Sequence, residues 1–132
     1  ATNTKLHLVK PLGFDISEKA VKRAGLDYWP YVDLEIHESL DDFMDKYKDK
    51  RKFLATTKGG HIYTDFEYMD DDMFLFGRET KGLPRDFIAK NEEMAIRIPM
   101  SENTRLRSFN LSNSANIILF EALRQLGFPE LK

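Results

Sequence analysis

The segment FGRETKGLP, residues 76–84, places charged side chains between two glycines directly after the apolar run MFLF. A residue without a Cβ atom lets a ligand lie against backbone amides, so this loop is a candidate binding site. The same glycines could simply form turns, because Gly and Pro are the commonest turn residues. Spacing alone leaves both interpretations open.

A second candidate is the polar segment PMSENTRLRSFNLSNS, residues 99–114, which is rich in Ser, Asn and Arg. Long loops in compact domains are disproportionately functional. Arg105 and Arg107 lie in this segment, and Arg97 precedes it. Surface arginines often only solubilise a protein, but three of them around one Ser/Asn loop favour a phosphate-bearing partner.

Other chemistries find less support in the sequence. The chain contains neither a G-x-x-x-x-G-K-[ST] nor a G-x-G-x-x-G motif, so nothing favours nucleoside triphosphate chemistry. His7 lies in an alternating strand pattern, where a structural histidine is commoner than a catalytic one. We find no ligand set beside His37 or His61, and the chain has no cysteine. We therefore expect no metal site.

Alternating strand-like and helix-like patterns must position these loops. The helix pattern is clearest at residues 39–50, where Leu40, Phe43, Met44 and Tyr47 share one face. Strands are predicted at residues 5–11, 32–38, 52–57, 72–77 and 94–100, and helices at 17–24, 39–50, 84–91 and 112–127. This order predicts an α/β domain with a mainly parallel sheet. Ligands of such sheets bind beyond the carboxyl ends of the strands, where residues 56–60, 77–84 and 99–114 all lie.

Length and composition limit the partners. The 132 residues are about the size of one domain, so we expect a single domain over residues 1–132. A net charge of −2 argues against binding nucleic acid through a general positive field. The lack of cysteine fits a reducing cytoplasm, and no apolar run approaches the roughly 20 residues of a membrane span. We expect a cytoplasmic protein without a membrane partner.

Five motifs together resemble a known family. FGRETKGLP, IRIPM and RSFNLSNSANIILFEALRQ, in this order and spacing, resemble the SPOUT class of RNA methyltransferases. LHLVKPLGF and KRAGLDYW are similar, within that class, to the small TrmL-type (YibK or CspR) tRNA 2'-O-methyltransferases. The resemblance covers essentially the whole chain. It implies an α/β fold with a mainly parallel sheet, helices on both faces and a C-terminal trefoil knot, assembled as a homodimer.

The resemblance also implies an activity. These enzymes move a methyl group from S-adenosylmethionine to the ribose 2'-hydroxyl of the wobble nucleotide, cytidine or a modified uridine, in certain leucine tRNAs. By motif, the cofactor-binding residues are Ala55, Thr56, Leu75, Gly77, Ile98, Met100, Ser108 and Leu111. Asn110 and Ser112 match polar positions near the methyl group and its acceptor. Glu79 would contact the sulfonium side of the cofactor or hold the loop.

The anticodon stem-loop of tRNA would need local cations, and the candidates are Lys22, Arg23, Arg105 and Arg107. Tyr28 and Trp29 could stack on unpaired bases or could be core residues. The last helix is apolar on more faces than one sheet can cover, which favours a dimer interface, although burial inside a knot would use much of the same surface.

One departure from the family pattern affects the expected activity. Family members normally begin with a strand and an N-T-G-N-x-x-R segment ahead of the LHLVKPLGF stretch, and neither is found here. We therefore expect the first family strand to be missing, together with an arginine near the reacting hydroxyl. Two alternatives stay open: a non-catalytic RNA- or S-adenosylmethionine-binding module, and a 2'-O-methyltransferase acting on another RNA such as rRNA.

Overall fold

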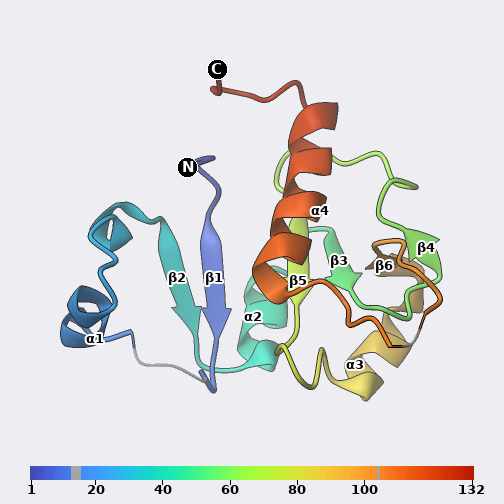
Figure 1. The fold of residues 1–132 in the computed structure, drawn as a ribbon, viewed down its shortest axis with the longest axis horizontal. Coiled ribbons are helices and arrows are strands. Elements are labelled where there is room, and N and C mark those ends of the chain that lie inside the picture. The colour runs from blue at the N-terminus through green and yellow to red at the C-terminus, as the bar shows by residue number, and fades with distance from the viewer. Residues whose placement is uncertain (13–15, 104) are drawn as a thin grey trace. The chain divides into compact units, whose positions relative to one another are not determined.

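The computed structural model describes residues 1–12, 16–103 and 105–132 (Figure 1). The last two residues of the LHLVKPLGF motif and Thr104 of the polar segment lie outside the described residues. The chain divides into two compact units, Ala1–Asp49 and Lys50–Lys132. Each unit is described by itself below.

The first unit contains a pair of parallel strands. Its elements are β1 (Leu6–Val9), α1 (Glu18–Arg23), a 3-10 turn at Trp29–Tyr31, β2 (Leu34–His37) and α2 (Leu40–Lys46). Both helices begin where the sequence predicts, because Ser17 accepts a hydrogen bond from the amide of Ala20 and Ser39 accepts one from the amide of Asp42. On α2, Phe43 is buried, as the helical spacing of its apolar residues predicts.

The second unit is built around a four-stranded parallel sheet in the order β4-β6-β3-β5. Its elements are β3 (Lys52–Ala55), β4 (His61–Ile62), β5 (Met73–Phe76), α3 (Arg85–Lys90), a 3-10 turn at Glu92–Met94, β6 (Ala95–Arg97) and α4 (Leu111–Gln125). Ile118 and Ala122 of α4 pack with Phe53 of β3, Ile96 of β6 and Tyr68 in one buried cluster. The parallel α/β architecture predicted from the sequence is thus confirmed.

Two features of the sheets differ from the sequence-based expectation. The described strands form two sheets, one of two strands and one of four, where a single sheet is expected from the sequence. Alternation of apolar and polar residues identifies strands but does not say which of them pair. The strand β4 is not predicted from the sequence either, because its two residues are too few to show a periodic pattern. It pairs with β6, and a Cβ atom on the neighbouring Gly59 would lie 2.8 Å from the carbonyl carbon of Ile96. Gly59 therefore lets the chain pass close to β6.

No helix in the described part of the chain combines the length and the apolar character needed to cross a membrane.

Candidate functional site

The carboxyl ends of three strands in the second unit stand level with one another. Ala55, the last residue of β3, pairs with Phe76 of β5 on one side and with Ile96 of β6 on the other. The amide of Thr56 continues this register by donating to the carbonyl of Ile96 across 3.0 Å. The strand register therefore brings the segments that begin at Thr56, Gly77 and Ile98 to one edge of the sheet, where ligands of parallel sheets bind.

The loop after β5 is closed by its own backbone. The amide of Gly82 donates to the carbonyl of Arg78 across 2.8 Å, and Gly82 adopts a positive φ of 67°. A Cβ atom on Gly77 would lie 2.0 Å from the carbonyl carbon of Gly82. The loop itself thus explains why residue 77 has no side chain. Glu79 is exposed within this loop.

The two polar residues assigned to the reacting centre lie together at the start of α4. Asn110 caps this helix, since its Oδ1 accepts a hydrogen bond of 2.8 Å from the amide of Asn113. The same oxygen accepts a 3.3 Å hydrogen bond from the hydroxyl of Ser112. In Figure 1, α4 begins at its lower end, and the arrowhead of β3 points downward. Asn110 and Ser112 are both exposed there.

The remaining predicted cofactor residues provide mainly apolar surface. Leu75 lies in the body of β5 and is buried, while Ala55 and Ile98 at the strand ends are partly buried. Met100 and Ser108 are exposed on the segment between β6 and α4, and Leu111 is exposed at the first turn of α4. Apolar side chains beside backbone polar groups suit a flat, weakly polar ring such as adenine.

Residues 1–120 match the model of the SpoU rRNA Methylase family. The chain belongs to the SpoU methylase family. A protein of Bacillus subtilis (strain 168), provisionally named a tRNA (cytidine(34)-2'-O)-methyltransferase, is 48% identical over 135 residues, which cover 100% of this chain and 83% of that protein. The expected family resemblance is confirmed.

Solved structures agree with this assignment. A structure described as giving insights into the 2-OH methylation of C/U34 on tRNA has a TM-score of 0.84 and 37% identity, and the match covers 95% of this SpoU methylase and 80% of that chain. The AdoMet-bound rRNA methyltransferase from Sinorhizobium meliloti has a TM-score of 0.75 and 25% identity, over 92% of this chain and 46% of that one.

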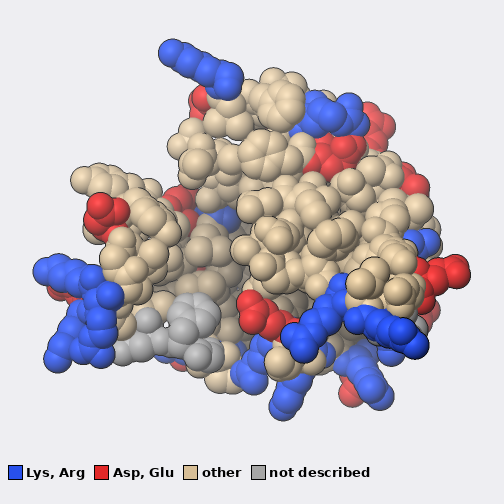
Figure 2. Space-filling model, in the orientation of Figure 1, with Lys and Arg blue, Asp and Glu red and all other residues tan. Residues whose placement is uncertain are grey.

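The cations predicted to bind RNA are all exposed in the SpoU methylase. In the second unit, Arg105 and Arg107 form no ion pair with any described residue. In the first unit, Lys22 pairs with Glu18 across 3.4 Å, whereas neighbouring Arg23 forms no ion pair with a described residue. Figure 2 shows Lys and Arg side chains gathered where α3 lies in Figure 1. Local positive surface therefore exists despite the negative net charge.

Aromatic side chains follow Lys22 and Arg23 in the chain. Tyr28 is 58% exposed, so the alternative that it is a core residue is wrong, whereas Trp29 is partly buried. Trp29 lines an open depression of about 560 Å³ together with Val21, Leu26 and Lys22. Tyr31, which no sequence motif marks as a candidate, is 88% exposed.

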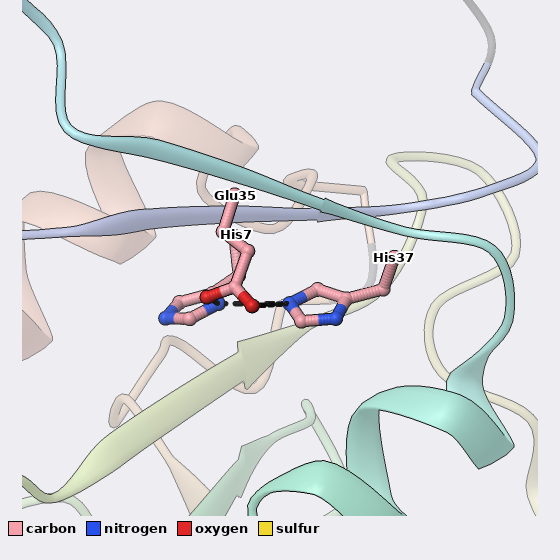
Figure 3. Close-up of side chains that lie close together, drawn as sticks. All are labelled: His7, Glu35 and His37. Atoms are coloured by element: carbon pink, nitrogen blue, oxygen red, sulfur yellow. Dashed lines mark hydrogen bonds and ion pairs between the residues drawn. The ribbon is translucent and has the colours of Figure 1, made fainter.

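The expectation that His37 has no ligand set beside it is wrong. In the register of β1 and β2, His7 lies opposite Glu35, and Glu35 and His37 are two residues apart on the same face of β2. His7 Nδ1 and His37 Nε2 share a hydrogen bond of 3.0 Å, and Glu35 carboxylate oxygens lie 3.7 Å and 4.0 Å from these two nitrogens (Figure 3). The sequence contains the period-two signal on each strand, but only the strand pairing brings the three residues together.

Charges around this cluster set its protonation. Hydrogen bonds from Lys46 and Tyr47 hold the pKa of the Glu35 carboxyl well below its ordinary value, and Lys5 lies 3.1 Å from the same carboxylate. Burial lowers the pKa of His7, although the negative charge of Glu35 opposes this effect. The cluster therefore combines an ionised carboxylate with a histidine that favours its neutral form.

Proposed function

We propose that this SpoU methylase transfers a methyl group from S-adenosylmethionine to the ribose 2'-hydroxyl of the wobble nucleotide, cytidine or a modified uridine, in tRNA. The observation that carries the proposal is its 48% identity, along the whole chain, to a protein provisionally named for this reaction. The 37% identity to the structure concerned with methylation of C/U34 supports the same acceptor. Leucine tRNAs are the substrates that the TrmL-type motifs favour.

The strand edge of the second unit suits the cofactor. Ala55 and Ile98 offer apolar side chains beside backbone groups, Thr56 adds a hydroxyl, and the closed loop at Gly77 stands at the same edge. Further lining would come from Leu75, Met100, Ser108 and Leu111. The AdoMet bound to the Sinorhizobium meliloti relative supports this choice of cofactor. Bound S-adenosylmethionine supplies an electrophilic methyl group on a sulfonium centre.

Residues at the start of α4 suit the acceptor. The oxygen of the Asn110 amide is engaged in capping, but its Nδ2 donates no hydrogen bond within the described part of the chain. This group can therefore donate to the acceptor ribose. Ser112, held by Asn110, can hydrogen-bond to the same ribose, and the exposed carboxylate of Glu79 can face the sulfonium charge. Such positioning matters because methyl transfer is an in-line displacement that requires the reacting atoms within about 3–3.5 Å.

Each unit contributes a candidate RNA contact. Arg105 and Arg107 in the second unit, and Lys22 and Arg23 in the first, are exposed cations that can neutralise phosphates of the anticodon stem-loop. The exposed ring of Tyr28 is available to stack on an unpaired base.

We further infer a homodimer assembled through α4, a C-terminal trefoil knot, one methyltransferase domain spanning residues 1–132, and a cytoplasmic location, where tRNA is found. The dimer is supported by the apolar side chains that α4 and the residues after it leave exposed. Phe120 is 47%, Phe128 42% and Leu126 37% exposed.

Ribosomal RNA is the second candidate substrate. It is favoured by the family model, which is described as a SpoU rRNA Methylase family, and by the rRNA methyltransferase from Sinorhizobium meliloti. The greater identity to the protein named for tRNA leads us to prefer tRNA.

Two measurements on the purified protein test the proposal. Calorimetric titration with S-adenosylhomocysteine should show one site per chain, and a tritiated-methyl assay should label tRNA but not rRNA. Nuclease digestion of the product should place the label at the 2'-O position of nucleotide 34. Binding without turnover on either RNA would support the non-catalytic module instead, and labelled rRNA with unlabelled tRNA would support the second candidate.

A further inference from the structure

The two histidines and the glutamate of the first unit direct their side chains toward a common point (Figure 3). His7, Glu35 and His37 each offer one ligand atom, and these atoms all lie within 4.8 Å of one another. We propose that His7 Nδ1, His37 Nε2 and a carboxylate oxygen of Glu35 form a zinc-binding site that joins β1 to β2. Nothing in the methyl-transfer site requires these residues.

The spacing of the three atoms suits tetrahedral coordination. Zinc binds histidine nitrogen and carboxylate oxygen at about 2.0–2.2 Å, so two ligand atoms of a tetrahedral site are roughly 3.3 Å apart. The observed separations are 3.0 Å between the histidine nitrogens, 3.7 Å from His7 Nδ1 to Glu35 Oε2 and 4.0 Å from His37 Nε2 to Glu35 Oε1. With one ligand atom from each residue, no separation exceeds 4.8 Å, so each changes by no more than about 1.5 Å on coordination, which side-chain rotation can supply. Water would complete the coordination.

The protein holds the three side chains in this arrangement before any ion arrives. Parallel pairing fixes His7 opposite Glu35, and the pleat returns His37 to the same face. His37 is buried at 6% exposure, and the rings of Phe43 and Tyr47 pack edge-on against both imidazoles. An apolar wall of this kind restricts water and fixes ring orientation around a metal.

Zinc would have to displace a proton and two ammonium groups. In the His7–His37 hydrogen bond, one nitrogen carries a proton, which must move to the other nitrogen of its ring when both lone pairs bind the ion. Glu35 also accepts hydrogen bonds from Lys46 and Tyr47 and pairs with Lys5. The side chains of Lys46 and Lys5 are 60% and 44% exposed, so water can solvate them once they leave the carboxylate. This competition makes the zinc affinity of the site lower than that of a structural zinc site, but it still allows zinc to bind.

The experiment is a titration of the purified protein with Zn²⁺ alone at neutral pH, in which calorimetry measures the heat of binding. We expect one ion per chain, with a dissociation constant on the order of micromolar. His7→Gln and His37→Gln should each weaken binding at least tenfold. His61→Gln is the matched control, because His61 is exposed in the second unit and is the only other histidine of the chain, and it should leave binding unchanged.

A second variant separates a metal site from a hydrogen-bonded cluster. Lys46→Met removes a competing cation, so it should tighten Zn²⁺ binding several-fold. Wild-type protein followed by histidine NMR gives a readout that needs no variant to fold: Zn²⁺ should shift the imidazole signals of two of the three histidines. The proposal is overturned if the wild-type protein binds no stoichiometric Zn²⁺, if binding survives both His7→Gln and His37→Gln, or if Zn²⁺ leaves all three histidine signals in place.

Discussion

The backbone of Gly82 lies so close to Gly77 that a Cβ atom on Gly77 would be 2.0 Å from the Gly82 carbonyl carbon. The requirement for glycine at residue 77 therefore comes first from loop closure. A ligand that contacts residue 77 would add a second requirement for glycine there. Substitutions at Gly77 must consequently be interpreted through the loop.

Gly77→Ala should displace the backbone of Gly82 and Leu83, because real Cβ contacts do not approach 2.0 Å. We expect a loss of about 1–3 kcal/mol of unfolding free energy, together with loss of S-adenosylhomocysteine binding. Gly60→Ala is the control, since a Cβ atom there would meet nothing within 4 Å, and it should change stability by less than about 0.5 kcal/mol. Thermal unfolding and calorimetry measure both effects. Normal cofactor binding by Gly77→Ala would exclude this loop from the cofactor site.

Variants of Asn110 should separate helix capping from catalysis. Asn110→Ala removes the acceptor of the Asn113 amide, so it should cost about 1 kcal/mol of stability. Asn110→Asp keeps an acceptor, and its negative charge suits a helix N-terminus, so stability should be retained. Because Asn110→Asp lacks the amide donor, methyl transfer should fall in both variants. Full turnover by the aspartate variant would show that the Asn110 amide does not donate to the acceptor.

The candidate RNA contacts predict a change in salt dependence. Replacing Lys22 and Arg23, or Arg105 and Arg107, by alanine should weaken tRNA binding and reduce the slope of log K against log salt by roughly 1.4–1.8. S-adenosylhomocysteine affinity should change by less than about twofold, or 0.4 kcal/mol. Filter binding at several salt concentrations measures the slope.

Lys48→Ala provides a control for these variants, because Lys48 is an exposed cation outside both candidate pairs. It should leave the slope unchanged. A pair whose removal does not alter tRNA affinity lies outside the RNA footprint.

The proposed dimer depends on the exposed apolar side of α4. Phe120→Asp places a charge at an apolar residue that is 47% exposed, and burying that charge between subunits would be costly. Sedimentation at micromolar concentration should give a dimer for the wild-type protein and a monomer for Phe120→Asp. Asn116→Asp, an exposed position on the same helix, should remain dimeric. A wild-type mass equal to one chain would contradict the assembly.

The raised pKa of Tyr68 predicts that the protein loses stability at alkaline pH. Its ring is 3% exposed and its hydroxyl donates to the carbonyl of Tyr63; burial, with nearby Glu121 and Asp72, raises its pKa to about 12. The unfolded chain loses this proton near pH 10 while the folded chain keeps it, so unfolding free energy falls between about pH 10 and 12.

The contribution of Tyr68 to this loss is at most about 2–3 kcal/mol. Tyr68→Phe should cost about 1 kcal/mol at neutral pH through the lost hydrogen bond, and it should flatten the alkaline decline. Urea unfolding at a series of pH values measures both. Equal slopes for the two proteins above pH 10 would show that Tyr68 does not titrate differently in the folded chain.

Local patterns in the sequence were sufficient for most of the helices and strands, though not for β4, and for the positions of the loops. The period-two pattern around Leu6–Val9, the helical spacing around Phe43 and the capping serines Ser17 and Ser39 all predict the elements observed. These signals are reliable because they depend on neighbours within one or two turns of the chain. Family motifs added the expected activity and the candidate residues.

Tertiary structure decided what depends on residues far apart in the chain. The pairing of β4 with β6, the closeness of Gly82 to Gly77, and the meeting of His7 with Glu35 and His37 have no sequence signal of their own. Strand register fixes which side chains face each other, and a shift of one residue would turn His7 away from Glu35. The sequence by itself therefore determined the elements and the order of the loops, whereas long-range strand pairing determined which residues share a site.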